Sequence, residues 1–332
     1  MSVYIIPQNR VPELLPMNEC VDVMTNVLRT LSRGDHLLPL RSLIRTPDGS
    51  GLLGVMPAIL GEPACMGIKV ITYFPGNAAA GFDSHQGAVL LFEPEHGVLV
   101  AVIDASSVTG IRTAAVSGAA TRALARDDAG DLAIIGTGVQ AITHLEAMSV
   151  VRKLHRVRVW DRHARNARAF VERESARHRI DIEVMASARE AVVGADIICT
   201  VTASKDPVVN GEWLAPGAHI NAVGACFPEA RELDTNAVVR SRLFVDRRES
   251  ALNEAGDFLI PRAEGAIGDD HIVGELGDVF GGRVPGRQSA GEITLFKSLG
   301  IAVEDLAAAH HVWMKARAAG EPGVEFGGHR IG

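Results

Sequence analysis

The feature that most constrains this chain is a short apolar run that ends in a glycine-rich turn. Residues 132–135 have the length and β-branched content of a buried strand, and a helix-like run over 139–151 follows the turn. Gly136, Gly138 and Ala141 give the G-x-G-x-x-A spacing of a dinucleotide-binding fingerprint. In that arrangement the first glycine permits the tight turn, the second lets the backbone approach a pyrophosphate, and the alanine allows close helix–strand packing.

The segment after the fingerprint distinguishes a nucleotide site from an ordinary glycine-rich turn. Residues 157–160 predict a second strand, and Asp161 ends it about 20 residues after the fingerprint, where an acid holds the ribose 2′-hydroxyl. This order of elements favours nucleotide binding. Because a carboxylate repels a 2′-phosphate, Asp161 favours NAD(H) over NADP(H). Arg162, His163 and Arg165 follow at once and offer that phosphate a partner, so both cofactors stay open.

Composition excludes several other classes of protein. The 332 residues are 47% hydrophobic and 22% charged with a net charge of −7, which suits two globular domains and argues against a nucleic-acid partner. No apolar run is long enough to span a membrane, and the N-terminus lacks a secretory pattern, so a cytoplasmic location is expected. Cys20, Cys65, Cys199 and Cys226 form no CxxC pair, so neither a disulfide framework nor a metal site is expected.

The pattern of elements differs between the first third of the chain and the rest. After the fingerprint, strands are expected over 182–185, 195–200, 218–223 and 243–245, with helices over 164–177, 188–193 and 235–240. This alternation predicts an α/β fold with a Rossmann-type, doubly wound parallel sheet. The first third instead predicts an α+β domain, with strands over 38–44, 51–59, 64–74, 87–92 and 98–104.

These patterns give an expected division into two domains. The α+β domain is placed at residues 1–115 and the nucleotide-binding domain at 116–311. A long helical pattern over 294–315, broken near Gly300, is expected to carry the chain back. Residues 312–332 are therefore assigned to the first domain.

Three basic residues of the first domain stand in unusual surroundings. Arg41 and Lys69 lie within predicted apolar strands, and Arg112 lies at the start of a helix rich in small residues. Each could pair with an acid elsewhere in the chain or extend to the surface, because a buried charge needs a partner. Few acids stand nearby in the sequence, so the three cations together suggest an anionic ligand such as a carboxylate. Ser84 and His85 could line the same pocket, although a structural role is expected for His85.

Long motifs along the chain carry a resemblance to a known family. They are LGVMPA at 53–58, SHQ at 84–86, VLLFE at 89–93, RTAA at 112–115, IGTGVQA at 135–141, GAHINAVG at 217–224, RELD at 231–234 and FKSLGIAVED at 296–305. With these motifs the chain resembles the ornithine cyclodeaminase/mu-crystallin family over nearly its whole length. The resemblance implies a homodimer whose N-terminal substrate-binding domains share a β-structure, and a Rossmann domain that carries NAD(P).

The resemblance also implies roles for individual residues. Arg41, Lys69 and Arg112 match the family positions that hold the substrate carboxylate, and Lys69 and Arg112 are the candidate catalytic residues. Ser84 and Cys226 complete the candidate substrate site. The candidate cofactor-binding residues are Thr113, Gly136, Thr137, Gly138, Val139, Gln140, Asp161, Arg162, Thr202, Val223 and Gly224.

One departure from the family pattern bears on the reaction. Cyclodeaminases resemble one another in a Gly-Asp-Cys-Pro-Gly-Lys segment whose aspartate handles the distal amine of the substrate, and Cys226 fills that position here. A neutral thiol cannot hold an ammonium group. The segment instead resembles Gly-Ala-Ser-Arg-Pro-Asp-Trp-Arg-Glu-Leu of the mu-crystallin branch, with Phe227 in place of its first arginine. Imine reduction is therefore favoured over ornithine cyclisation, and Cys226 is expected to be a small spectator residue.

The expected reaction is hydride transfer from nicotinamide C4 to an iminium carbon beside a carboxylate, which turns an imino acid into an L-amino acid. Arg41 and Arg112 would fix the carboxylate, and Lys69 would add a charge or donate a proton. Three alternatives stay open: an ornithine cyclodeaminase, an alanine-type amino-acid dehydrogenase, and a non-catalytic ligand-binding protein of the mu-crystallin kind. Pyrroline, piperideine, iminosuccinate and linear ketimines all remain candidate imines.

Overall fold

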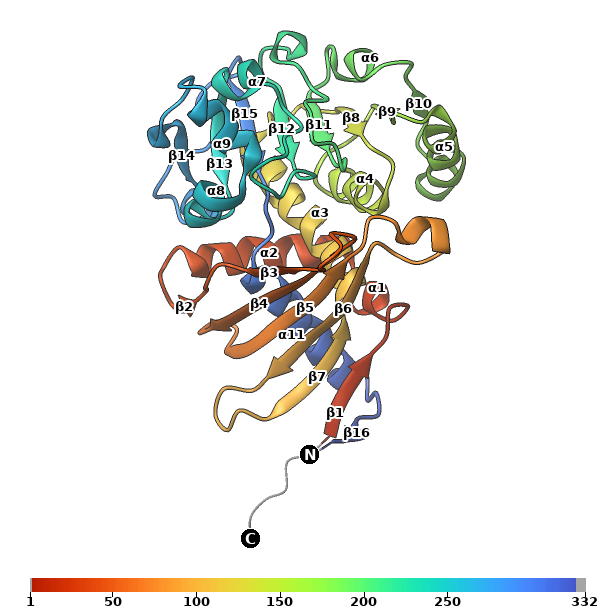
Figure 1. Cartoon of the computed structure of the whole chain (residues 1–332), viewed down its shortest axis with the longest axis vertical. Coiled ribbons are helices and arrows are strands. Elements are labelled where there is room, and N and C mark those ends of the chain that lie inside the picture. The colour runs from red at the N-terminus through yellow and green to blue at the C-terminus, as the bar shows by residue number, and fades with distance from the viewer. Residues whose placement is uncertain (1, 327–332) are drawn as a thin grey trace. The chain divides into compact units, whose positions relative to one another are not determined.

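The computed structural model describes residues 2–326 and divides into two compact units, which are considered separately (Figure 1). Unit 1 is Met1–Arg112 with Ile301–Gly332, and unit 2 is Thr113–Gly300. From the sequence, we expected the chain to enter the second domain after residue 115 and to return to the first after residue 311. In the structure both passages between the units come earlier in the chain. Of the expected C-terminal tail, residues 327–332 lie outside the described part of the chain.

Unit 2 is built on one sheet with the strand order β10-β9-β8-β11-β12-β15-β13-β14. Its strands are β8 (Asp131–Ile135), β9 (Arg156–Trp160), β10 (Ile182–Val184), β11 (Ile197–Thr200), β12 (His219–Ala222), β13 (Ser241–Val245), β14 (Ile272–Glu275) and β15 (Ile293–Lys297). Within the described residues all of its strand pairings are parallel. The chain reverses its direction of travel across the sheet between β8 and β11, which confirms the predicted doubly wound fold.

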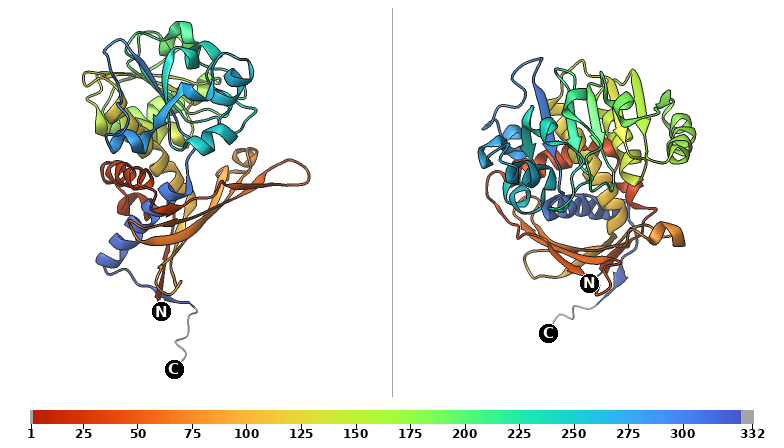
Figure 2. Two further views of the ribbon diagram at one scale, coloured as in Figure 1. Left: turned by 90° about the vertical axis from the view of Figure 1, so that its left-hand side faces the viewer. Right: turned by 45° about the horizontal axis from the view of Figure 1, so that its top comes forward.

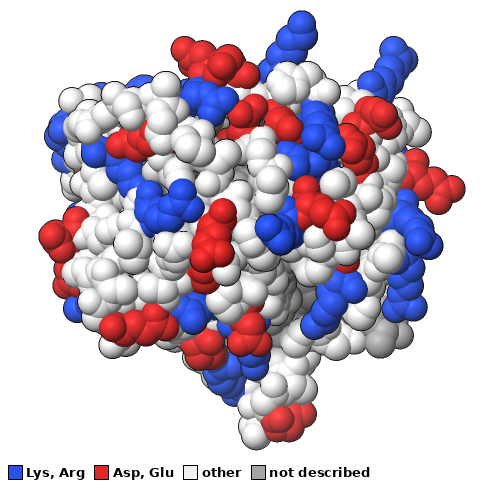
Figure 3. All heavy atoms as spheres, turned by 90° about the horizontal axis from the view of Figure 1, so that it is seen from above, with Lys and Arg blue, Asp and Glu red and all other residues white. Residues whose placement is uncertain are grey.

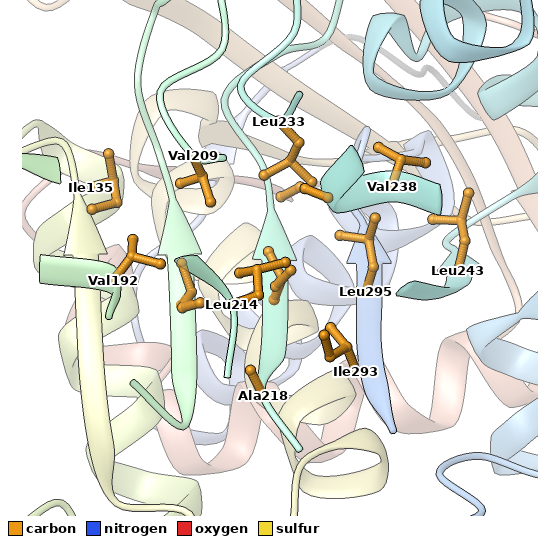
Figure 4. Packing of buried hydrophobic residues seen from close by; sticks show 14 of the residues in the cluster. Ile135, Val192, Val209, Leu214, Ala218, Leu233, Val238, Leu243, Ile293 and Leu295 are labelled. Atoms are coloured by element: carbon orange, nitrogen blue, oxygen red, sulfur yellow. The ribbon is translucent and has the colours of Figure 1, made fainter. Parts of the chain in front are cut away.

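Helices connect these strands and cover the sheet. They are α4 (Val139–Val151), α5 (Ala164–His178), α6 (Ala188–Val192), α7 (Thr235–Val239), α8 (Arg248–Glu254), α9 (Gly256–Ala263) and α10 (Leu276–Phe280). Figure 4 shows Ile135 and Leu295 of the sheet packing in one cluster with Val192 of α6 and Val238 of α7. Burying an aliphatic side chain of this size contributes about 1.5–3 kcal/mol, so this layer largely holds the unit together.

Strand β15 corrects the predicted helix over 294–315. Residues 293–297 pair in parallel with both β12 and β13 and are fully buried. The chain then turns at Gly300, whose φ is +73°, and helix α11 (Ala302–Ala318) begins only after that turn. A short apolar run buried on both faces has no alternation, so its sequence alone does not separate a strand from a buried helix.

Unit 1 has the predicted α+β character. Its sheet has the order β16-β1-β7-β6-β5-β4-β2, and β3 also pairs with β4. The strands are β1 (Ser2–Ile6), β2 (His36–Leu37), β3 (Ser42–Arg45), β4 (Leu52–Leu60), β5 (Cys65–Tyr73), β6 (His85–Phe92), β7 (Leu99–Asp104) and β16 (Val324–Glu325). The helices are α1 (Val11–Leu14), α2 (Met17–Leu31) and α11, and α3 (Ala105–Leu124) begins in this unit and ends in unit 2.

The two faces of the unit 1 sheet differ in burial. Along β4, buried residues such as Met56 and Ala58 alternate with the more accessible Val55, Pro57 and Ile59. Helices α2 and α11 lie on one side of this sheet (Figure 2). The other face is also apolar and carries a groove of about 490 Å³ lined by side chains of β4, β5 and β6. Within the described residues, no helix is both long and apolar enough to cross a bilayer.

Candidate functional site

In unit 2 the glycine-rich turn has the geometry that its spacing predicts. Gly136 has a φ of +109°, and a Cβ there would lie 2.8 Å from the carbonyl oxygen of Val201, so the turn requires glycine. Gly138 directly precedes α4, and a Cβ built on it meets nothing within 4 Å. The N-terminus of α4 therefore opens on free space, and the positive end of its dipole suits a phosphate group.

Asp161 lies beside this turn because β9 pairs with β8 in register, Trp160 opposite Ile135. Its carboxylate accepts hydrogen bonds from the Thr137 hydroxyl at 2.6 Å and from the backbone N–H of His163 at 2.8 Å. These two hydrogen bonds orient the acid across the turn. Arg162 follows it and is exposed.

The ends of β11 and β12 bring three more predicted cofactor residues to the same edge of the sheet. Thr202 follows β11, and Val223 and Gly224 follow β12. The fully buried Glu232 joins the two segments: it accepts hydrogen bonds from the N–H of Thr202 at 2.6 Å and from the N–H of Gly224 at 2.7 Å. A Cβ on Gly224 would lie 2.0 Å from the Thr202 carbonyl oxygen, so the close approach requires glycine.

Glu232 was not predicted individually, although it lies within the RELD motif at 231–234. Its burial and the neighbouring Asp257 raise the pKa of its carboxyl. Asp257 in turn forms a buried ion pair with Lys297 at 2.9 Å and accepts the Glu232 N–H at 2.8 Å. This buried network fixes the loops at the carboxyl edge of the sheet, where doubly wound folds bind their ligands.

The remaining predicted residues of unit 2 are in varied surroundings. Thr113 is buried in α3, whereas Val139 is exposed in the first turn of α4 and Gln140 follows it. Cys226 is half-buried after β12, and its thiol donates to the carbonyl oxygen of Val223 at 3.4 Å.

Figure 3 shows one face of the molecule on which acidic and basic side chains are interspersed, so this face has no extended field of one sign.

In unit 1 two of the three predicted cations form a buried cluster with two acids of α11. The Lys69 ammonium lies 2.7 Å from Asp305 Oδ2. Arg112 donates from Nε to Asp305 Oδ1 at 2.9 Å and from Nη1 to Glu304 Oε2 at 2.7 Å. All four side chains are at most 4% exposed. β5, α3 and α11 each contribute to the cluster.

These ion pairs supply acids that are far from the cations in the sequence. Glu304 and Asp305 follow Arg112 by 192 and 193 residues in the sequence. They end the FKSLGIAVED motif at 296–305, which is the one signal in the sequence that pointed to them. Lys69 and Arg112 therefore both pair with acids elsewhere in the chain, and their binding of a substrate carboxylate stays a prediction.

Arg41 also differs from its predicted position. It lies in the irregular segment between β2 and β3 rather than inside a strand, and it is half-buried. Its charge nevertheless acts on Lys69. Burial, followed by the charges of Arg112 and Arg41, lowers the pKa of Lys69 to about 8, although Asp305 acts in the opposite direction. An amine with this pKa exchanges its proton readily near neutral pH.

His85 is the first residue of β6 in the same unit, and Ser84 directly precedes it. The Ser84 hydroxyl lies 3.0 Å from Nδ1 of His85, and the imidazole packs on the Tyr73 ring with centroids 4.7 Å apart. Although His85 is exposed, desolvation by the surrounding atoms and the nearby charge of Lys69 lower its pKa to about 4, so this side chain is neutral at pH 7. The contact with Tyr73 agrees with the structural role expected for His85.

Comparisons with known proteins match nearly the whole chain. The family model described as "Ornithine cyclodeaminase/mu-crystallin family" matches residues 3–320. Ketimine reductase mu-crystallin of Mus musculus is 42% identical over 280 residues, which are 84% of this chain and 85% of that protein.

Two solved structures are similar along nearly the whole chain. Δ1-Pyrroline-2-carboxylate reductase of Thermococcus litoralis, solved with NADH and L-proline, superposes with a TM-score of 0.94 at 37% identity and covers 98% of this chain and 100% of that one. An archaeal alanine dehydrogenase dimer with bound NAD has a TM-score of 0.92 at 32% identity and covers 98% of this chain and 99% of that one.

Proposed function

The chain belongs to the ornithine cyclodeaminase/mu-crystallin family, and we propose that it reduces a 2-imino acid to an L-amino acid with NADH. The observation that carries this proposal is the buried pair of cations, Lys69 and Arg112, in a chain that also has the dinucleotide turn at Gly136. The similar T. litoralis enzyme was solved with L-proline, the product expected from a five-membered cyclic imino acid.

The residues of unit 2 fit a bound dinucleotide. The free space at Gly138 and the N-terminus of α4 suit the pyrophosphate, and Asp161 suits the adenosine ribose. The reduced nicotinamide, when bound, supplies the hydride. Glu232 holds the Thr202 and Gly224 segments in place and thereby shapes the edge on which the cofactor lies.

The residues of unit 1 fit a carboxylate substrate. A carboxylate can accept hydrogen bonds from guanidinium and ammonium groups, and burial strengthens the attraction. Glu304 and Asp305 pair with Lys69 and Arg112, and Arg41 acts on Lys69 from nearby, so we keep all three cations as the proposed ligands of the substrate carboxylate. Lys69 is the proposed proton donor to the imine nitrogen, since its pKa of about 8 allows transfer near neutral pH.

Cys226 sets the expected limit on the substrate. Ornithine cyclisation needs an anion that steadies the distal amine, whereas Cys226 is half-buried and bonds to a backbone carbonyl. We therefore expect a cyclic imino acid such as Δ1-pyrroline-2-carboxylate to be reduced and ornithine to yield little or no proline. Cys226→Ser should keep the reductase activity, because only a small neutral side chain is required there.

A substrate panel with NADH and NADPH tests the proposal directly. The arms are cyclic and linear imino acids, pyruvate with ammonia, and ornithine. Net NADH oxidation with an imino acid supports the reductase. Efficient release of ammonia and proline from ornithine without net redox would instead identify a cyclodeaminase, and turnover of pyruvate with ammonia alone would identify an amino-acid dehydrogenase. Binding of imino acids without any turnover would indicate a non-catalytic protein.

We also propose a homodimer formed through the open face of the unit 1 sheet. This face is apolar: Ile59 is 41% exposed and Leu37 is 65% exposed, beside a groove lined by Pro57, Ile68 and Phe92. A contiguous apolar surface of this kind is typical of an interface, and the similar alanine dehydrogenase was solved as a dimer. Light scattering should give twice the chain mass, and Ile59→Lys with Ile68→Glu should give monomers. A monomeric wild type would contradict the proposal.

We also propose a cytoplasmic location. Cys20, Cys65, Cys199 and Cys226 all carry free thiols, which suits a reducing compartment. Cell fractionation with an antibody to the chain would test this, and recovery from an oxidising compartment would contradict it.

A further inference from the structure

We propose that Asp305 is a positioning residue for Lys69: its carboxylate holds the ammonium group in place and keeps the proton on Lys69 until the imine accepts it. The inference rests on the proposed function. In the step considered, an Nζ–H bond of Lys69 breaks and an N–H bond forms at the imine nitrogen through its lone pair. The carbon receives the hydride of the reduced nicotinamide, which is thereby oxidised, and the neutral Lys69 amine regains a proton from solvent.

The geometry of the carboxylate carries this inference. Asp305 uses its two oxygens for two different cations: Oδ2 lies 2.7 Å from Lys69 Nζ, and Oδ1 accepts from Arg112 Nε at 2.9 Å. Its side chain is 1% exposed. A buried acid that bridges two cations fixes the distance between them, so it also fixes the proposed proton donor relative to the proposed carboxylate ligand.

The charged side chains around Lys69 explain how Asp305 affects the pKa of Lys69. Arg112 of α3 and Arg41, which precedes β3, act on Lys69 as positive charges. His85 of β6 is neutral near pH 7, and the Thr109 hydroxyl of α3 lies 3.4 Å from Nζ. Asp305 opposes the cations and favours the charged ammonium. Removing its charge should therefore lower the pKa of Lys69.

Glu304 offers a matched control on the same helix. It is the neighbour of Asp305 in the sequence and is equally buried, and its carboxylate bonds to Nη1 of Arg112, 2.7 Å away. Cys20 of α2 lies near Arg112 and Glu304 on that side, and burial raises the pKa of its thiol, so it is neutral. Removing the charge of Glu304 disturbs the Arg112 side of the cluster while the contact between Asp305 and Lys69 remains.

The experiment compares pH profiles of kcat/KM for the full chain with NADH and an imino acid that the wild type reduces. The wild type should lose activity at alkaline pH through a group with a pKa of about 8. In Asp305→Asn this alkaline limb of the pH profile should move to lower pH by about 1 unit or more, the usual effect of removing a contacting opposite charge. Glu304→Gln should raise KM and leave the limb in place, and Asp305→Glu should restore most of the shift.

Different outcomes would contradict this inference and the proposed function. A limb that stays in place in an active Asp305→Asn enzyme would overturn the inference, since it would show either a purely structural role or an imine that arrives already protonated. Titration of the Lys69 side chain by NMR needs no substrate, so it separates this inference from the proposed function. Lys69 titrating at its ordinary value in the wild type would contradict the inference even if Asp305→Asn did not fold. Failure of the wild type to reduce any imino acid would instead overturn the proposed function.

Discussion

The two units build their candidate sites from different kinds of sequence information. In unit 2 the turn at Gly136 and the acid Asp161 belong to consecutive elements, β8, α4 and β9, and the register of β8 with β9 brings them together. In unit 1 the cluster joins Lys69 and Arg112 to Asp305, which lies on the last helix of the chain. The site in unit 2 is therefore specified by residues that are close together in the sequence. The charge cluster in unit 1 forms only when segments far apart in the sequence come together.

The largest expected effect comes from breaking the long-range cluster. Arg112→Ala leaves the buried Glu304 and Asp305 without their guanidinium partner. Breaking a buried ion pair on one side costs about 3–5 kcal/mol, so the variant should lose both stability and nearly all turnover. Denaturant unfolding and kcat/KM measure the two effects. A fully stable variant would show that the ion pairs contribute little to stability.

Acid should destabilise unit 2 through two buried imidazoles. Burial lowers the pKa of His144 to about 4 and of His219 to about 3. The unfolded chain takes up these protons below its ordinary histidine pKa of about 6.5, whereas the folded chain does not, so stability falls as pH decreases from about 6.5 to 4. At full effect the lowered pKa corresponds to roughly 3 kcal/mol for His144 and roughly 5 kcal/mol for His219.

Chemical denaturation of the full chain at pH 7.5 and pH 4.5 measures this loss. His144 donates from Nδ1 to the Gln140 carbonyl oxygen, 2.7 Å away, and its Nε2 lies 2.9 Å from the Ser117 hydroxyl. His144→Gln retains a polar group there without a titrating proton, so its stability should depend less on pH. An equal pH dependence in wild type and variant would contradict the assignment.

The two glycines of the turn should separate folding from cofactor binding. Gly136→Ala forces a Cβ to within 2.8 Å of a carbonyl oxygen at a φ of +109°, and should destabilise unit 2 by about 1–3 kcal/mol. Gly138→Ala meets no protein atom within 4 Å and should fold normally, but its methyl group would occupy the proposed phosphate space. Thermal unfolding and NADH titration measure both variants. Wild-type NADH affinity in Gly138→Ala would remove that residue from the cofactor site.

The difference between the local site of unit 2 and the long-range cluster of unit 1 also explains what the sequence could predict. The strands, turn and acid around Gly136 follow from local spacing, and the structure has them where they were expected. Strand β15 was missed because it is buried on both faces, so its five residues do not alternate regularly between apolar and polar. Asp305 was missed as a partner because no local pattern shows which distant helix covers β5. Glu232 could be recognised as important only once the ends of β11 and β12 were seen side by side.

The smallest expected effect concerns the choice between NADH and NADPH. Asp161 accepts a hydrogen bond from the Thr137 hydroxyl at 2.6 Å, so its carboxylate already faces the turn, and a 2′-phosphate there would meet a negative charge. Asp161→Ala removes that repulsion as well as the proposed bond to the ribose. The ratio of kcat/KM for NADH to that for NADPH should therefore fall, by about tenfold for each 1.4 kcal/mol of preference lost. Arg162→Ala is the matched control, since this exposed side chain is the neighbouring candidate partner for a phosphate. It should leave the use of NADH unchanged. A wild type that strongly prefers NADPH would reverse the assignment and make Arg162 the determinant.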